Sequence, residues 1–255
     1  MEIINKKISA ILPVYNSEKT LDRCLRSIYR QEHKLDEIVI VDNGSNDNTK
    51  NIINLWQENL PIKYFKNERN MGLSFSLRRA INECEGELLL RIDSDDEWES
   101  NHIQEIIKLS KKNNAVLFAT RSQYLSEESK LIHYTKFLSN DSVRKILMWD
   151  NPFVHSSIAF KKSDYFLTSG YSDNSYAQDY ALYIELLKKG ELAFSDKITV
   201  SYFVNSGSLS RLNIKASKNA RFRYQLRSII YFWKKHPFEA LKILPILIVR
   251  MIFLI

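Results

Sequence analysis

Short apolar segments alternate with helical segments along the first half of this 255-residue chain, and this alternation limits the fold more than any other feature. Runs rich in Ile, Leu and Val have the length of buried strands; they lie at residues 8–14, 37–41, 62–65, 88–92 and 115–120. Helices are expected between them, at residues 17–30 with Ser17 as the N-cap and near residues 52–56, 76–83 and 102–111. This order predicts βαβ units and an α/β fold with a mostly parallel sheet.

Residues 121–210 have a less regular pattern. An apolar strand is expected after residue 157, followed by a short helix capped by Ser163. Residues 175–178 have the S-x-x-Q form of a capping box, which predicts a helix that runs to Lys189 and stops at Gly190. Asp179 then lies in the first turn of that helix.

Polar residues follow three of the predicted strands. Tyr15 and Asn16 follow the first, Asp42 and Asn43 the second, and the sequence Asp-Ser-Asp-Asp at residues 93–96 the fourth. The carboxyl ends of parallel strands form one edge of a sheet, where ligands of such folds bind. Three carboxylates in four positions repel one another unless a cation lies between them, and oxygen ligands favour Mg²⁺ or Mn²⁺. The sequence therefore predicts a divalent metal that holds a diphosphate at this edge.

These segments resemble the family 2 inverting glycosyltransferases, which share a GT-A-type nucleotide-diphospho-sugar fold. The resemblance is carried, in the family's order and spacing, by residues 8–16, 38–47, 67–74, 86–96, 155–157, 170–171 and 178–182. It implies a Rossmann-like, mostly parallel sheet flanked by helices, within a catalytic domain over residues 1–210. Residues 1–120 would form the nucleotide-binding half, residues 121–210 the acceptor-binding half, and residues 211–255 a basic, apolar helical extension.

The resemblance also implies roles for single residues. Asp95 would bind the metal, with Asp93 as a second ligand or at the ribose. Asp179 would be the catalytic base that deprotonates an acceptor hydroxyl for one inverting displacement, while the metal stabilises the departing nucleoside diphosphate. His155 and Gln178 would lie on the acceptor side. The residues expected to bind the nucleotide-sugar are Pro13, Val14, Tyr15, Asn16, Glu18, Asp42, Asn43, Arg78, Arg91, Asp93 and Ser94.

Within this set, Tyr15 would stack on the nucleobase, and Asp42 and Asn43 would contact its edge. Asn43 replaces a second Asp that is frequent in the family, and its amide can donate as well as accept. UDP is therefore the favoured nucleotide, with GDP and dTDP left open. Arg78 stands where Asn is frequent and would reach a phosphate, and Gln178 replaces the usual Glu before the base. The predicted base itself is retained, so an active enzyme is expected.

Other classes of protein fit less well. A sugar nucleotidyltransferase needs a glycine-rich loop after its first strand, and residues 13–17 contain no glycine; a Rossmann dehydrogenase needs G-x-G-x-x-G. A glycoside hydrolase would use two carboxylates and water, which leaves the nucleotide-like edge unexplained. A catalytically silent sugar-nucleotide-binding or scaffold protein at a membrane stays open.

The net charge of +7 is concentrated at the end of the chain. Residues 211–255 carry ten Lys or Arg against one acid, Glu239, and end in an apolar run that is too short to span a bilayer. Such a segment fits a helix on an anionic membrane surface; packing on the domain or against a second copy in a homodimer is the alternative. No nucleic-acid motif accompanies the charge.

Cys24 and Cys84 are expected to be reduced packing residues, and no signal peptide is recognised at the first residues. Together these features predict a cytoplasmic enzyme, peripheral on the inner face of the cell membrane. It would be a hexosyl- or N-acetylhexosaminyltransferase of bacterial surface polysaccharide synthesis, acting on a glycan acceptor that a lipid carries.

Overall fold

The computed structural model describes residues 7–136, 143, 146–147, 150–173, 177–204, 222 and 224–226 of the chain. Its strands are β1 (Ile8–Val14), β2 (Glu37–Asp42), β3 (Ile62–Lys66), β4 (Leu88–Arg91), β5 (Glu97–Trp98), β6 (Ala115–Ser126), β7 (Leu131–Tyr134), β8 (Ile158–Lys161) and β9 (Glu191–Val204). Its helices are α1 (Leu21–Tyr29), α2 (Thr49–Trp56), α3 (Leu73–Glu83), α4 (His102–Ser110), α6 (Lys162–Tyr165), α7 (Gln178–Leu187) and the 3₁₀ turn η2 (His155–Ser157). Strands and helices alternate from β1 to β4, as the sequence predicts.

The strands form one sheet in the order β3-β2-β1-β4-β8-β6-β9-β5, with β7 paired to β6. β3, β2, β1 and β4 are parallel neighbours. β2 and β4 lie on opposite sides of β1, so the loops after these strands diverge at the carboxyl edge, which is where ligands bind in such sheets. β8 joins antiparallel to β4 and to β6, while β6 and β9 are parallel. The sheet therefore continues from the predicted nucleotide-binding half into the second half of the chain.

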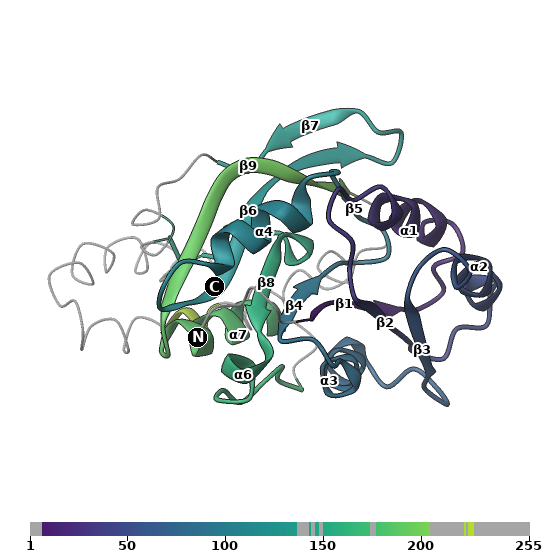
Figure 1. The fold of residues 1–255 in the computed structure, drawn as a ribbon, viewed down its shortest axis with the longest axis horizontal. Helices are drawn as coiled ribbons and strands as arrows, with labels where there is room; N and C mark the ends of the chain where they lie inside the picture. Colours follow the sequence, from purple (N-terminus) through teal and green to yellow (C-terminus); the bar gives the residue numbers. More distant parts are fainter. Residues whose placement is uncertain are drawn as a thin grey trace, which may run out of the picture.

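Helices cover both faces of the sheet (Figure 1). α1, α2 and α4 pack over one apolar core, which includes Leu25, Ile53 and Ile106. α3, α6 and α7 pack over the other, which includes Leu77 and Leu182. Two buried cores with the sheet between them make a three-layer α/β/α arrangement, and this confirms the predicted fold class.

Two of the predicted helix caps are wrong. The backbone carbonyl of Ser17, and not its hydroxyl, receives the first amides of α1. The hydroxyl of Ser17 instead lies 2.8 Å from the hydroxyl of Ser94. α6 begins at Lys162, so Ser163 lies inside the helix, where it donates to Glu87. In both places a hydrogen bond to a distant residue replaces the local cap.

The predicted base helix exists as α7. The residue before it, Ala177, has a left-handed φ of 55° and makes no side-chain cap. Ser175, the first residue of the predicted capping box, lies outside the described residues.

The predicted extension over residues 211–255 lies outside the described residues, apart from positions 222 and 224–226. Its membrane contact, and the division of residues 1–210 into two halves, stay predictions. In the part of the chain that the structure describes, no helix is both long and apolar enough to cross a membrane. Cys24 and Cys84 are free and buried, as expected.

Candidate active site

The loop after β1 presents Tyr15 and Asn16 at the carboxyl edge of the sheet. Tyr15 is 48% exposed, so its ring is open to a ligand that stacks on it. Asn16 has a φ of 47°, in the left-handed region that Asn tolerates better than most residues. The backbone amide of Asn16 donates to Ser45 Oγ at 2.9 Å, and its side-chain Oδ1 accepts the backbone amide of Asn46 at 3.0 Å. The loops after β1 and β2 are thus held together, and Ser94 joins the loop after β4 to them through Ser17.

The neighbouring residues predicted to bind the donor lie in the strand or turn toward α2. Pro13 and Val14 are buried residues at the end of β1. Glu18 is exposed, and its carboxylate accepts the amide of Asn48 at 3.1 Å while its own amide donates to Asp47 at 3.0 Å. Glu18 therefore joins this loop to the start of α2.

Asp42, the last residue of β2, is fully buried. Its Oδ1 accepts the amide of Ser45 at 2.7 Å, and its Oδ2 accepts the hydroxyl of Tyr64 at 2.9 Å. Burial and the hydrogen bond to Asp42 raise the pKa of Tyr64, so this phenol remains a donor. Both carboxylate oxygens therefore have protein partners, and the side chain has no exposed surface at which to meet a nucleobase edge.

Asn43 fastens the loop that leads into α3. Its Oδ1 accepts Asn67 Nδ2 at 3.0 Å and the amide of Met71 at 2.9 Å, and its Nδ2 donates to Asn70 Oδ1 at 2.8 Å. The last contact needs an amide, because a carboxylate cannot donate. The structure thus gives a local reason for Asn at this position, since both polar atoms of its side chain have protein partners.

Arg91 lies behind the loop after β4 and is fully buried. Its guanidinium pairs with the carboxylate of Asp93 and also donates to the carbonyl of Ile92. Burial alone would raise the pKa of Asp93, but the charge of Arg91 and the hydrogen bonds with Arg91 and Ser156 act together to hold this pKa below its ordinary value. The predicted direct contact between Arg91 and a donor does not fit this structure, because no part of the side chain is exposed. Arg91 orients Asp93 from inside the protein.

The three carboxylates of residues 93–96 take different positions. Asp93 and Asp95 are partly exposed, whereas Asp96 is fully buried. Ser156 donates its hydroxyl to Asp96, and the amide of Phe203 donates to it at 3.3 Å. Burial raises the pKa of Asp96 well above its ordinary value, and the charges of Asp95 and Asp93 add to this effect. Asp96 is therefore an internal anchor of the loop, while Asp93 and Asp95 remain at the edge.

Asp179 lies in the first turn of α7, where the helix dipole favours a negative charge. Asn151 Nδ2 donates to its Oδ2 at 2.7 Å and so orients the carboxylate. Asp179 is partly exposed, whereas Gln178 is only 8% exposed. The predicted place of Gln178 on the acceptor side is thus poorly supported, since its side chain packs into the protein.

His155 lies between the β4 loop and α7, where its ring centroid is 6.5 Å from that of Tyr183. The next residue, Ser156, accepts the amide of Asp93 at 2.9 Å, and His155 Nε2 lies 2.8 Å from the hydroxyl of Tyr171. Burial lowers the pKa of His155 to about 3, so the ring is neutral at neutral pH. Burial raises the pKa of Tyr171, and Asp179 and Asp93 both act on this hydroxyl electrostatically. One cluster therefore joins the predicted donor and acceptor sides.

Residues 9–167 match the family model described as "Glycosyl transferase family 2". The chain belongs to glycosyl transferase family 2. A relative from Escherichia coli, named UDP-Gal:alpha-D-GlcNAc-diphosphoundecaprenol beta-1,3-galactosyltransferase, is 31% identical over 191 residues, which make up 72% of this chain and 69% of the relative. The chain is therefore a glycosyltransferase, which confirms the predicted family and enzyme class.

Two solved structures share the fold of this family 2 glycosyltransferase. Staphylococcus aureus TarS 1–349 in complex with UDP-GlcNAc has a TM-score of 0.69 and 20% identity, over 88% of this chain and 66% of that chain. The mannosyltransferase PcManGT from Pyrobaculum calidifontis, in complex with GDP-Man and Mn²⁺, has a TM-score of 0.65 and 16% identity, over 90% of this chain and 64% of that chain. This glycosyltransferase thus covers less than two thirds of the length of either neighbour, and the likeness shows the fold.

A metal ion in this glycosyltransferase would have Asp93 and Asp95 as its carboxylate ligands. Among the described residues, no group of three or more His, Cys, Asp or Glu is placed to hold a metal ion. Mg²⁺ is usually held by one or two carboxylates together with substrate phosphates and water. The two edge carboxylates fit an ion that a diphosphate completes, and they do not fit a closed metal cage.

Arg78, on α3, has protein partners for both ends of its guanidinium. Its Nη1 donates to the carbonyl of Tyr171 at 2.7 Å, and its Nη2 lies 2.6 Å from Asp173 Oδ1. In this structure Arg78 therefore holds residues 171–173, and the predicted contact with a donor phosphate would require it to leave them.

The sequence does not predict the role of several residues that hold the site together. Ser156 and Tyr171 stand in segments that resemble the family, but nothing in those segments indicates that they hold the β4 loop and His155. Tyr64 and Asn151 give no signal at all, because each bonds to a carboxylate far away along the chain. Only the folded sheet brings these pairs together.

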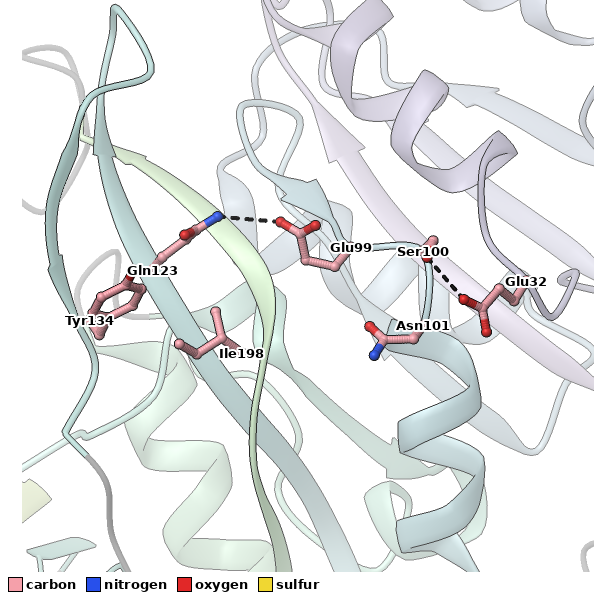
Figure 2. Close-up of a pocket in the computed structure, with 7 residues that line it drawn as sticks. All are labelled: Glu32, Glu99, Ser100, Asn101, Gln123, Tyr134 and Ile198. Atoms are coloured by element: carbon pink, nitrogen blue, oxygen red, sulfur yellow. Dashed lines mark hydrogen bonds between the residues drawn. The ribbon is translucent and has the colours of Figure 1, made fainter.

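An open pocket of about 460 Å³ lies near the start of α4 and strands β6, β7 and β9 (Figure 2). Its lining residues are Glu32, Glu99, Ser100, Asn101, Gln123, Tyr134 and Ile198. Several of them bond to one another: Gln123 donates to Glu99 at 3.3 Å, and Ser100 donates to Glu32 at 3.0 Å. The pocket shares no residue with the predicted site, so it is separate from the catalytic edge.

Proposed function

We propose that this glycosyltransferase moves one sugar from a nucleotide-diphospho-sugar, with UDP as the favoured nucleotide, to a hydroxyl of a lipid-linked glycan, with inversion at the anomeric carbon. The observation that carries the proposal is the turn of His155 and Ser156: Ser156 accepts the amide of Asp93, and the ring of His155 meets Tyr183 on the helix that bears Asp179. The E. coli relative supports this choice, because its name specifies UDP-Gal and a GlcNAc-diphosphoundecaprenol acceptor. Synthesis of a bacterial surface polysaccharide is the corresponding role.

On the acceptor side, Asp179 takes the proton from the attacking hydroxyl. Asn151 holds one of its carboxylate oxygens, so the group keeps a defined direction during transfer. His155 is neutral at neutral pH, so it offers the acceptor or the diphosphate a hydrogen bond without adding charge. One displacement directed by a single base needs no covalent intermediate on the enzyme.

On the donor side, Tyr15 provides an exposed ring on which the nucleobase stacks. Asp93, kept ionised by Arg91, and Asp95 place negative charge where the diphosphate binds. A bound Mg²⁺ or Mn²⁺ would stabilise the charge that develops on the departing nucleoside diphosphate. The fold neighbours carry UDP-GlcNAc in one case and GDP-Man in the other, so the base and the sugar must be determined by screening.

Release of nucleoside diphosphate from a panel of nucleotide-sugars, with Mn²⁺ and a GlcNAc-diphosphate-lipid acceptor, tests the proposal. Asp179→Asn is expected to lower kcat by about 10²–10⁴, the usual contribution of a general base, while UDP still binds. Asp196→Asn is the matched control, because Asp196 is an exposed aspartate on β9. An Asp179→Asn variant that keeps the wild-type rate would show that the base lies elsewhere.

Asp95→Asn tests the donor side separately. We expect it to weaken UDP binding in the presence of Mn²⁺, measured by calorimetry, and to leave binding without metal unchanged. An equal loss with and without Mn²⁺ would mean that Asp95 contacts the nucleotide and not a metal.

The basic extension is proposed to hold the enzyme on the inner, anionic face of the cell membrane, where a lipid-linked acceptor would be found. Co-sedimentation with anionic vesicles should fall when residues 237–255 are removed. Unchanged sedimentation would leave domain packing or dimer formation as the role of the segment.

A further inference from the structure

Arg78, on α3, bonds to residues 171 and 173, which precede α7 in the chain. We propose that Arg78 is a positioning residue for the acceptor side, which fixes Tyr171 and, through it, His155. The inference rests on the proposed roles of His155 and Asp179. It goes beyond them because it assigns Arg78 a function in which it touches neither donor nor acceptor.

The two ends of the Arg78 guanidinium meet different surroundings. Nη1 donates at 2.7 Å to the carbonyl of Tyr171, a residue that is 1% exposed. Nη2 lies 2.6 Å from Asp173, whose side chain is 90% exposed. Water screens an exposed ion pair and competes for its partners, whereas a charge-assisted hydrogen bond at a buried segment is stronger and better ordered. The bond to Tyr171 is therefore the one that holds the segment in place.

Tyr171 is constrained on its other sides, so the position of its backbone decides the position of its hydroxyl. Its amide donates to the hydroxyl of Tyr165 at 3.2 Å. Gly170, with a left-handed φ of 66°, turns the chain so closely over Tyr165 that an added Cβ would lie 2.6 Å from that hydroxyl. The Tyr171 hydroxyl then meets His155 Nε2 at 2.8 Å. A shift of the Tyr171 backbone would lengthen this contact directly.

α3, which carries Arg78, is itself held in place by packing against the core. Leu77 and Ala80, close to Arg78 on the same helix, are fully buried in the core beneath the sheet. Leu73, at the start of α3, and Ala177, just before α7, pack against that same core. α3 and the residue before α7 therefore pack against one core, and the helix that carries Arg78 is fixed on that core.

A role of Arg78 in binding the donor phosphate is the competing explanation, and it predicts different kinetics. A phosphate ligand acts in donor binding, so its loss would weaken UDP affinity and raise the KM for the donor. A positioning residue acts on the geometry of the acceptor side, so its loss would lower kcat and leave UDP affinity unchanged. Removal of Asp173 would release one end of Arg78 and should strengthen donor binding only in the phosphate case.

The experiment compares Arg78→Ala, Arg78→Lys and Asp173→Ala in the full chain. We expect Arg78→Ala to lower kcat by about ten- to a hundredfold, as expected for a small misplacement of reacting groups, with UDP affinity within about twofold of wild type. Arg78→Lys should recover part of the loss, because one ammonium can still reach the Tyr171 carbonyl. Asp173→Ala should stay within about twofold of wild type in kcat and in UDP affinity, because water already competes for this exposed pair.

Hydrogen exchange over residues 165–173 provides a readout that does not depend on activity. Exchange should be faster in Arg78→Ala than in wild type and unchanged in Asp173→Ala. Unchanged exchange in Arg78→Ala, or a loss of UDP affinity larger than the loss of kcat, would overturn the inference. If the wild-type enzyme transferred no sugar from any donor, the proposed function would fail, while the exchange result would still decide whether Arg78 holds this segment.

Discussion

Replacement of Ser156 by Ala should loosen the loop that carries Asp93 and Asp95. Ser156 is fully buried, accepts the amide of Asp93 at 2.9 Å and donates to the buried carboxylate of Asp96. The hydrogen bond itself contributes about 0.5–1.5 kcal/mol, and a buried amide left without a partner costs about 1–3 kcal/mol. Because the two effects share one hydroxyl, they do not add fully, and we expect a total loss of about 2–4 kcal/mol in the free energy of unfolding.

Ser157→Ala is the matched control for this change. Ser157 lies in the same 3₁₀ turn and is also fully buried, but its hydroxyl donates at 2.8 Å to the neutral carbonyl of Val154. Loss of a neutral hydrogen bond costs about 0.5–1.5 kcal/mol. Urea unfolding of both variants measures the difference directly, provided that the m-value is unchanged.

A double-mutant cycle with Asp96→Asn isolates the contact between Ser156 and Asp96. We expect a coupling energy of about 1–2 kcal/mol, within the range found for residues in one hydrogen-bond network. UDP affinity in the presence of Mn²⁺ should fall in Ser156→Ala and not in Ser157→Ala. If the two alanine variants lost equal stability and the cycle showed no coupling, the argument that Ser156 organises this loop would be refuted.

Three further changes test other parts of the structure. Glu37→Gln should cost stability at pH 7 but not at low pH. Burial alone would raise the pKa of Glu37, but hydrogen bonds from a lysine, a serine and two backbone amides lower it, so the stabilisation that is present above pH 4.5 is lost as the pH falls. A constant difference in urea unfolding from pH 7 to 4 would contradict this. Gly44→Ala should lower Tm more than Gly72→Ala, since both have positive φ but only at Gly44 would a Cβ lie 2.7 Å from a backbone carbon; equal shifts would show that φ alone decides. Asn43→Asp should cost about 1–3 kcal/mol in urea unfolding, because it removes the donor that meets Asn70 Oδ1 at 2.8 Å, and unchanged stability would count against that contact.

The fold could be predicted from the sequence where strands are buried on both faces. Every residue of β1, β2 and β4 is buried, so continuous apolar runs identify these strands without knowledge of their neighbours. The strand predicted at residues 115–120 continues in the structure as β6 to residue 126, and β7 is not predicted at all. The second half of β6 is half-buried and β7 is exposed, so neither has a continuous apolar pattern that would mark it as a strand.

The sequence predicts which loops lie at the carboxyl edge of the sheet, but not which of their side chains are bonded within the protein. Charge and hydrogen-bonding capacity are visible at Asp42, Arg78 and Arg91, yet Asp42 and Arg78 bond to residues that only the fold brings near, and Arg91 is buried against its own neighbours. Arg78 bonds to Tyr171 across 93 positions of the chain, and Arg91 is fully buried although it lies next to the loop. A charged residue beside a predicted site can therefore hold the loops of that site in place and need not contact the ligand.

The antiparallel strand β8 explains how the two sides of the site meet. Leu90 near the end of β4 pairs with Ala159 near the start of β8, so the chain that leaves β4 toward Asp93 lies beside the chain that enters β8 from His155 and Ser156. A parallel strand in this place would have presented its carboxyl end to the β4 loop and sent the preceding turn to the opposite edge of the sheet. The reversal at β8 therefore brings a turn of the predicted acceptor side to the predicted donor loop. The hydrogen bond from the backbone amide of Asp93 to Ser156 follows from the direction of that one strand.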